Sequence, residues 1–131
     1  LDLLAEVAAD AGLALMLITH DLAVVWQNTA DMLVMYAGRV VERGPTRAVF
    51  RRMAHPYTRA LLAASPGALD APLAAGRRLA TIPGSVPDPF SVPSGCAFYP
   101  RCPAAKRGAC NEEVPLMEVE PGHMVRCTLY M

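Results

Sequence analysis

All four cysteines of this chain lie near its C-terminal end, in a segment that is rich in proline. They are spaced as Cys-x5-Cys-Pro-x6-Cys-x16-Cys, at Cys96, Cys102, Cys110 and Cys127. Prolines at 87, 89, 93, 100, 103, 115 and 121 leave the segment little helical or strand periodicity. From Ile82 to Tyr130 we therefore expect no means of staying folded other than a tie through the cysteines, either metal ligation or disulfides.

Length, charge and hydropathy limit the classes of function. At 131 residues the chain has the length of one domain. It begins at Leu1 inside an amphipathic pattern without a leader, so we expect it to be a piece of a longer chain. Its 12 basic and 12 acidic residues form no basic stripe, which argues against nucleic acid as a partner. Without a secretory signal, four cysteines favour metal over disulfides.

The first part of the chain has the pattern of an α/β domain. Apolar spacing over residues 1–11, followed by Gly12, predicts a helix with a left-handed cap. The apolar run Leu13–Ile18 predicts a buried strand of a covered parallel sheet. At six residues it falls far short of the roughly 20 that span a bilayer, so membrane association is expected only through a protein partner. A second helix over 22–29 and a buried strand over 32–36 follow.

Turn and breaker residues predict the remaining elements. Ala37-Gly38 turns the chain into a hairpin strand at the sheet edge, and Gly44-Pro45-Thr46 begins a helix that ends near Met53. Pro56 begins another helix, which ends at Ser65-Pro66-Gly67. The Ala, Gly and Pro composition beyond it predicts a linker, followed by a short strand over 79–82.

Several stretches together resemble the C-terminal part of an ABC-transporter ATPase. They are Leu17-Ile-Thr-His-Asp21, Val34 to Thr46 and His55-Pro-Tyr-Thr-Arg-Ala-Leu-Leu62. Three further stretches resemble the C-terminal extension of the oligopeptide/dipeptide branch of these ATPases: Ile82-Pro-Gly-Ser-Val-Pro-Asp-Pro89, Pro93 to Pro103 and Gly122-His-Met-Val-Arg-Cys127. The resemblance divides the chain into the end of a nucleotide-binding domain (1–66), a linker (67–78) and an irregular, cysteine-rich extension that binds a metal or cluster (79–131).

By this resemblance, His20 is the switch histidine, whose imidazole contacts the γ-phosphate of ATP and helps to place the attacking water. Taken alone, a His after a strand is more often a surface or core residue. The charge of Asp21 is read as favourable to the start of the next helix.

The sequence departs from the family pattern by what it lacks. It contains no G-x-x-x-x-G-K-[ST] phosphate loop, no Leu-Ser-Gly-Gly segment and no apolar strand ending in Asp-Glu. ATP and Mg²⁺ are therefore expected cofactors of the whole protein, and residues 1–131 alone are expected to be inactive. Trp26 is expected to have a packing role.

The resemblance also implies that Cys96, Cys102, Cys110 and Cys127 ligate a [4Fe-4S] cluster. The spacing lacks the Cys-x2-Cys knuckles of structural zinc, but it does not itself name the metal, so zinc, reduced thiols and disulfides remain open. His123 is a further candidate ligand, but four cysteines already complete the set, so a structural role or a contact that supports the ligands is expected. Arg101 and Arg126 either offset the negative charge of the thiolates or are ordinary surface residues.

The function implied is that of the ATP-hydrolysing subunit of an importer of di- and oligopeptides. Its expected partners are a second ATPase subunit, two transmembrane permease subunits and, indirectly, an extracytoplasmic peptide-binding protein. It would lie on the cytoplasmic face of the membrane. The alternatives are an importer of nickel or another small solute, a freestanding metal-binding interaction module formed by residues 79–131, and a redox sensor.

Overall fold

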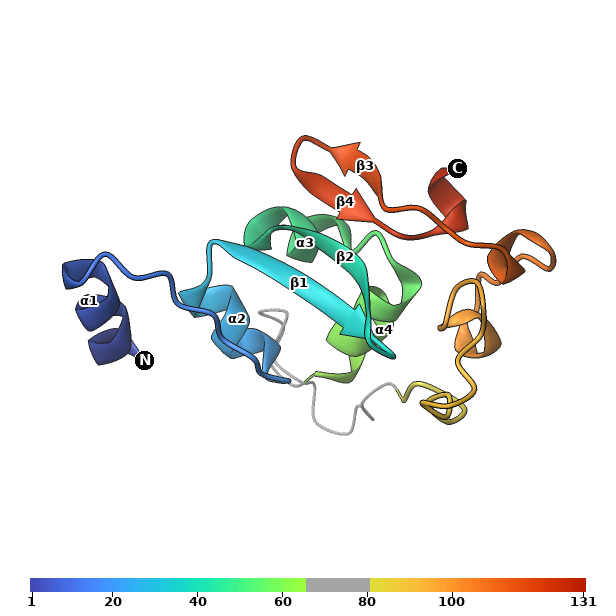
Figure 1. Ribbon diagram of the computed structural model, residues 1–131, viewed down its shortest axis with the longest axis horizontal. Coiled ribbons are helices and arrows are strands. Elements are labelled where there is room, and N and C mark those ends of the chain that lie inside the picture. The colour runs from blue at the N-terminus through green and yellow to red at the C-terminus, as the bar shows by residue number, and fades with distance from the viewer. Residues whose placement is uncertain (66–80) are drawn as a thin grey trace, which may run out of the picture.

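The computed structural model describes residues 1–65 and 81–131 (Figure 1). Its helices are α1 (Asp2–Asp10), α2 (Leu22–Asn28), α3 (Thr46–Arg52) and α4 (Pro56–Ala64). Its strands are β1 (Asp31–Tyr36), β2 (Arg39–Pro45), β3 (Met117–Glu120) and β4 (His123–Val125). Three short 3-10 helices are η1 (Tyr99–Arg101), η2 (Ala109–Asn111) and η3 (Thr128–Tyr130).

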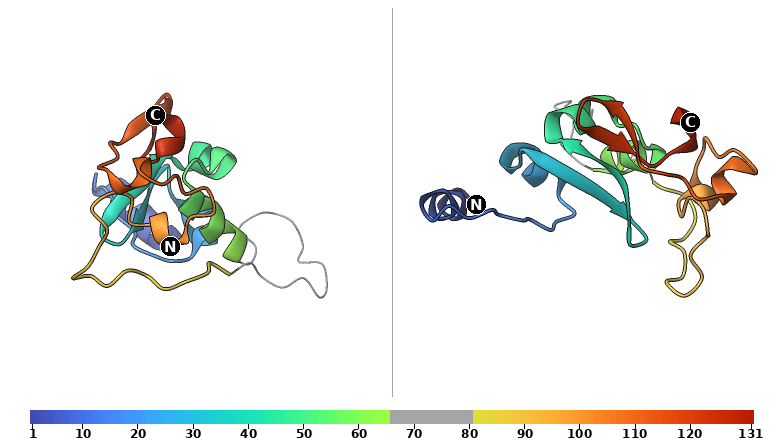
Figure 2. Two further views of the ribbon diagram at one scale, coloured as in Figure 1. Left: turned by 90° about the vertical axis from the view of Figure 1, so that its right-hand side faces the viewer. Right: turned by 45° about the horizontal axis from the view of Figure 1, so that its top comes forward.

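One four-stranded sheet of the described residues joins residues 31–45 to residues 117–125. Its strand order is β1-β2-β4-β3, and all three pairings are antiparallel. The pairing of β4 with β2 places Val125 opposite Glu42 and Met124 opposite Arg43. The hairpin β3-β4 lies beside β1-β2 in the three ribbon views (Figures 1 and 2). The expectation that residues 82–130 have no other means of staying folded was therefore wrong for residues 117–125, because backbone hydrogen bonds of this sheet hold them.

The β1-β2 hairpin has the predicted turn, but its strand β1 is less buried than predicted. Ala37 and Gly38 both have positive φ, 46° and 75°, which suits a two-residue turn between twisted strands. Burial alternates along β1, and Leu33 and Met35 are more than half exposed. The strand is thus covered on one face only, whereas the sequence predicted a fully buried strand.

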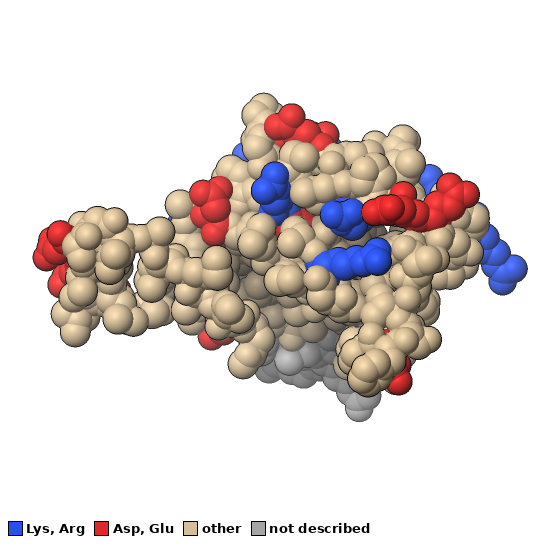
Figure 3. All heavy atoms as spheres, in the orientation of Figure 1, with Lys and Arg blue, Asp and Glu red and all other residues tan. Residues whose placement is uncertain are grey.

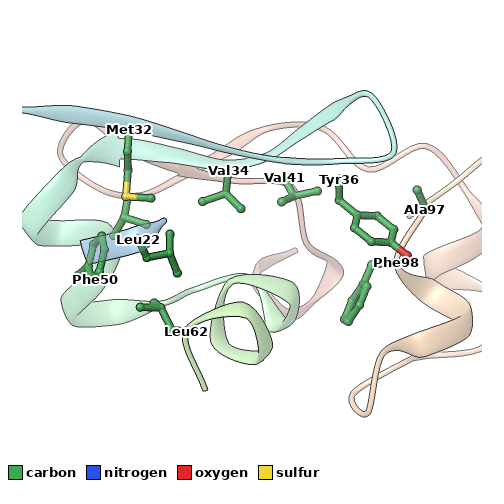
Figure 4. Close-up of a cluster of buried hydrophobic side chains, with 10 residues drawn as sticks. Leu22, Met32, Val34, Tyr36, Val41, Phe50, Leu62, Ala97 and Phe98 are labelled. Atoms are coloured by element: carbon green, nitrogen blue, oxygen red, sulfur yellow. The ribbon is translucent and has the colours of Figure 1, made fainter. Parts of the chain in front are cut away.

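The core fills the covered face of this hairpin (Figure 4). Helices α2, α3 and α4 each contribute to it, through Leu22, Phe50 and Leu62. Phe98, from the cysteine-rich segment, is completely buried in the same cluster. Burial of a side chain of this size stabilises by about 1.5 to 3 kcal/mol, so the cysteine-rich segment is anchored by packing as well as by the sheet.

Local signals explain where the helices begin and end. Asp21 caps α2, its Oδ1 accepting from the backbone N–H groups of Ala23 and Val24 at 2.9 and 3.3 Å. Helix α3 is capped at its C-terminal end by Met53, whose backbone has the left-handed conformation with φ of 46°. Pro56 occupies the first turn of α4, as predicted.

The predicted buried strand over Leu13–Ile18 is not formed. Helix α1 ends as predicted, with Gly12 at φ of 65°. The following residues are extended but pair with no strand among the described residues, and Met16 and Ile18 are 81% and 91% exposed. A buried parallel strand needs neighbours on its edges and helices on its faces. The described part of the chain supplies neither, and α1 projects from the rest (Figure 1).

Other expectations concern the middle of the chain. The linker over 67–78, with Leu79 and Ala80 of the expected strand, lies outside the described residues, while Thr81 and Ile82 are irregular. The division at these residues remains a prediction. Among residues 1–65 and 81–131, no helix is long and apolar enough to cross a bilayer.

Trp26 packs, as expected. Its ring centroid is 5.0 Å from that of Phe50, and the Arg47 guanidinium carbon lies 3.5 Å from its centroid. Trp26 therefore joins α2 to α3 through an aromatic pair and a cation–π contact.

Candidate functional site

The four cysteines lie on the short helices and the strand end of the C-terminal segment. Cys96 and Cys102 flank η1 and are half-buried. Cys110 lies within η2, and Cys127 follows β4; both are buried. All four are free thiols.

Burial and neighbouring cysteines both raise the pKa values of three of the thiols. The pKa of Cys127 is raised by burial and further by the charges of the other three cysteines. Burial likewise raises the pKa of Cys102, with smaller contributions from Cys96 and Cys110. Burial raises the pKa of Cys96, and Cys110 adds to the effect. Each cysteine is therefore within electrostatic reach of the other three.

The backbone brings two of these cysteines together. The Cys96 N–H donates to the Cys110 carbonyl at 2.9 Å. Gly95 permits this approach, since a Cβ there would lie 2.2 Å from the same carbonyl oxygen. The glycine of the Pro-Ser-Gly-Cys sequence is thus required by close packing of the two loops.

The expected four-sulfur centre is not shown by this arrangement. In the part of the chain that the structure describes, no three His, Cys, Asp or Glu side chains are placed as metal ligands. Cys110 Sγ instead lies 3.2 Å from Thr128 Oγ1 and accepts a hydrogen bond from the backbone N–H of Lys106 at 3.4 Å. Protonated thiols have no mutual attraction that would draw the sulfurs inward, because ligation requires the thiolate. The donor set, four thiols, is nevertheless of the soft kind that suits an iron–sulfur or zinc site.

Two arginines beside the cysteines donate hydrogen bonds to backbone carbonyl groups of other segments. Arg101 donates to the carbonyls of Pro83 and Ile82 at 2.8 and 2.9 Å and to the Tyr36 hydroxyl at 3.2 Å. Neither proposed role for this arginine, charge compensation or ordinary surface residue, describes these contacts. The guanidinium instead ties the start of the extension to the end of β1.

Arg126 acts in the same way. It donates to Val40 O at 3.1 Å and to Val114 O at 2.7 Å, and its own N–H donates to Val41 O at 2.8 Å. These contacts hold the chain before Cys127 on β2, and charge compensation of the sulfurs by Arg126 stays a prediction.

The residue that sequence reasoning missed is Glu42. Its side chain is completely buried and accepts three hydrogen bonds. Oε1 accepts from Ala54 N–H at 2.8 Å and from His123 Nε2 at 2.7 Å, and Oε2 accepts from His55 N–H at 2.9 Å. Three donors satisfy a buried carboxylate that would otherwise be costly. The available signal was a glutamate directly after Val40 and Val41, since a buried glutamate is uncommon in a core.

His123 is structural, as expected. Its ring is completely buried against Glu42, and Nε2 serves as the donor. Nδ1 has no partner among the described residues. A Cβ at Gly44 would lie 2.9 Å from the His123 Cα, so β2 has a glycine where β4 approaches most closely.

His55 begins α4 from within the core. Its Nδ1 accepts from Tyr57 N–H at 3.0 Å, which leaves the proton on Nε2. Nε2 is buried without a partner in the described residues. Burial, with a smaller contribution from Arg59, lowers the pKa of His55 to about 4, so the ring is neutral at neutral pH.

A comparison with known families decides the assignment. A family described as the oligopeptide/dipeptide transporter, C-terminal region, matches residues 41–110, just over half of the chain. The chain belongs to this family. The match covers β2 from Val41 onward, both helices that follow it and three of the four cysteines.

Relatives of this family align with nearly the whole chain. A putative peptide import ATP-binding protein of Brucella ovis is 45% identical over 130 residues, covering 97% of this chain and 38% of the relative. A probable peptide ABC transporter ATP-binding protein of Sinorhizobium fredii is 44% identical, with 97% and 35% covered. A dipeptide transport ATP-binding protein of Escherichia coli is 43% identical, with 97% and 38% covered. The chain thus spans less than two-fifths of these relatives' length.

The predicted switch residue of this family member, His20, is exposed at the end of the extended stretch before α2. Asp21, which follows it, caps α2 with its side chain. The backbone N–H of Asp21 donates to Thr19 Oγ1 at 3.0 Å. The His20 backbone is therefore positioned by a capped turn, and its role in catalysis remains a prediction.

Proposed function

We propose that this chain is the C-terminal part of the ATP-hydrolysing subunit of an ABC importer for di- and oligopeptides, with ATP and Mg²⁺ as its cofactors. The supporting observation is the family match, together with relatives named for peptide import that are 43% to 45% identical along 97% of the chain. Because residues 1–131 contain no phosphate loop, nucleotide binding is assigned in this proposal to the rest of the protein.

The proposal includes a place in a larger assembly. The partners are a second ATPase subunit, two permease subunits and, indirectly, a peptide-binding protein, with the subunit on the cytoplasmic face of the membrane. Exposed apolar residues support burial of the N-terminal end against further protein: Leu13, Leu15, Met16 and Ile18 are each at least 55% exposed. On the face shown in Figure 3, acidic and basic side chains both occur among uncharged residues.

Within this subunit, His20 is proposed to contact the γ-phosphate. An imidazole can donate to a phosphate oxygen through one nitrogen while the other is held by a neighbour. Its exposed place on a turn, next to the Asp21 cap, leaves the ring accessible to a nucleotide bound by the rest of the domain.

Cys96, Cys102, Cys110 and Cys127 are proposed as the ligands of a [4Fe-4S] cluster, with zinc as the alternative. The support is the family assignment and the influence of the four thiols on one another's pKa values. Such a cluster would supply a rigid link among the cysteine-bearing segments. For a cluster to bind, the protein must hold the four cysteine thiols close together, and the thiols must lose their protons.

Uptake by cells tests the transport proposal. The gene is deleted, and accumulation of a labelled dipeptide is measured with and without the wild-type gene restored. We expect dipeptide uptake to be lost and then restored, with nickel uptake unchanged. Loss of nickel uptake with dipeptide uptake intact would contradict the peptide assignment and favour the small-solute alternative.

A further inference from the structure

We propose that the buried Glu42 carboxylate, through His123 and Ala54, positions Cys127 in the four-cysteine site. This inference rests on the proposed function of that site, but it concerns protein contacts that exist without a metal. Glu42 touches no cysteine itself, so it is a positioning residue.

The first contact fixes the strand that leads to Cys127. Oε1 of Glu42 lies 2.7 Å from His123 Nε2, and both side chains are completely buried. His123 begins β4, which ends at Val125, two residues before Cys127. The hydrogen bond therefore sets the position of β4 on β2 at the strand's first residue. Glu42 with Val125 and Arg43 with Met124 are paired between the strands, and the Arg126 N–H donates to Val41 O at 2.8 Å just before Cys127. The side-chain bond adds to these backbone contacts at the start of β4.

The second contact fixes the residue against which Cys127 packs. Ala54 is completely buried, and it forms a cluster with Val125 and Cys127. Its N–H donates to the same Oε1 of Glu42 at 2.8 Å. The Tyr130 hydroxyl donates to the Ala54 carbonyl at 3.3 Å, and the Tyr130 N–H donates to the Cys127 carbonyl at 3.2 Å. The Glu42 carboxylate thus contacts both β4, the strand that precedes Cys127, and Ala54, which packs in the same cluster as Cys127.

The arrangement also explains why a charge is buried there. A neutral side chain such as Gln would turn its NH₂ group toward one of the three N–H donors that Glu42 now accepts. Only a carboxylate accepts on both oxygens. In the described residues, Cys96 and Cys102 flank η1 and lie outside these contacts, whereas Cys110 Sγ lies 3.2 Å from Oγ1 of Thr128, the residue after Cys127. The effect should therefore appear at Cys127 and not at Cys96 or Cys102.

Reactivity of individual cysteines tests the proposal. The whole protein is freed of metal, and the labelling rate of each cysteine by N-ethylmaleimide is measured by peptide mass spectrometry. His123→Leu removes the donor to Glu42, whereas His123→Gln keeps an amide N–H near the place of Nε2. Glu120→Gln is the control, since Glu120 lies on β3 of the same hairpin and pairs at the surface with Arg51 and Arg52 at 2.8 and 2.7 Å.

We expect His123→Leu to raise the labelling rate of Cys127 about tenfold or more, because loss of a hydrogen bond to a charged group favours local opening. Labelling of Cys96 and Cys102 should stay unchanged, and His123→Gln and Glu120→Gln should behave as wild type. In anaerobically purified protein, the iron content of His123→Leu should fall at least about tenfold at limiting iron.

Two outcomes would overturn the proposal. Wild-type labelling of Cys127 in His123→Leu would show that the contact does not position it. An equal rise at all four cysteines would show that the pair only holds the extension folded. If wild-type protein contains neither iron nor zinc, the proposed metal site fails, while the labelling pattern still decides the role of Glu42.

Discussion

The ring of Phe98 lies edge-on to the ring of Tyr36, with centroids 5.3 Å apart and planes at 83°. Tyr36 ends β1, and Phe98 lies between Cys96 and Cys102, so this pair joins the hairpin directly to the cysteine-rich loops. Tyr57 completes the contact from α4, 5.4 Å from Phe98. The cysteine segment therefore packs against the aromatic side chains of β1 and α4.

Replacement of Phe98 by Ala should release the cysteine loops. Loss of a fully buried Phe costs about 3 to 5 kcal/mol, and we expect the extension of the whole protein to become sensitive to protease before the rest does. Phe90→Ala is the matched control, because Phe90 is 99% exposed, and its effect should be within about 0.5 kcal/mol. Equal protease resistance of the two variants would contradict the anchoring role of Phe98.

Substitution of Gly95 should separate the two loops that carry Cys96 and Cys110. In Gly95→Ala, the new Cβ would meet the Cys110 carbonyl at 2.2 Å, so one backbone must move. We expect a loss of about 1 to 3 kcal/mol in the free energy of unfolding, measured by urea denaturation. Ser94→Ala, which removes one exposed hydrogen bond to Asn111 O at 3.1 Å, serves as control. A tolerated Gly95→Ala would mean that the loops are not closely packed.

His55 should make the protein less stable in acid. Burial lowers its pKa to about 4 from 6.5, so the unfolded chain binds the proton more readily than the folded one. Stability is unaffected above pH 6.5 and is lost as the pH falls toward 4, by roughly 3 kcal/mol in total. His55→Asn keeps a capping acceptor but cannot titrate, so urea unfolding between pH 6.5 and 4 should show a smaller loss of stability in this variant. Parallel wild-type and variant profiles would contradict a neutral buried His55.

His20→Ala in the whole protein should separate binding of ATP from its hydrolysis. We expect nucleotide affinity to stay within a few-fold and turnover to fall about 10²-fold or more, since the contact matters most as charge develops on the transferred phosphoryl group. Asp21→Asn, which keeps the cap oxygen of α2, should retain turnover. Equal losses of binding and turnover in His20→Ala would assign it a structural role.

The sequence predicts the elements that depend on local signals. The Ala37-Gly38 turn, the start of α4 at Pro56 and the end of α1 before Gly12 all follow from the backbone preferences of single residues. The pairing of β4 with β2 could not be predicted in this way. It joins residues some 80 positions apart, and short strands near prolines carry a weak pattern.

Two further differences have the same origin in tertiary context. The apolar run Leu13–Ile18 indicates that these side chains require cover, but not which segment supplies it, and the described chain supplies none. Glu42 was missed because one charge in a strand is usually placed on the solvent face. Only its distances to Ala54, His55 and His123 show that it faces inward.

The most direct test of this account is the metal content of the whole protein purified without oxygen. The four-cysteine site predicts a brown protein with iron and sulfide in equal amounts, about four of each per chain. Replacement of any one of Cys96, Cys102, Cys110 or Cys127 by Ser should remove the colour. A colourless protein with stoichiometric zinc would contradict the cluster but keep the site, whereas a metal-free protein with two disulfides would contradict the site itself.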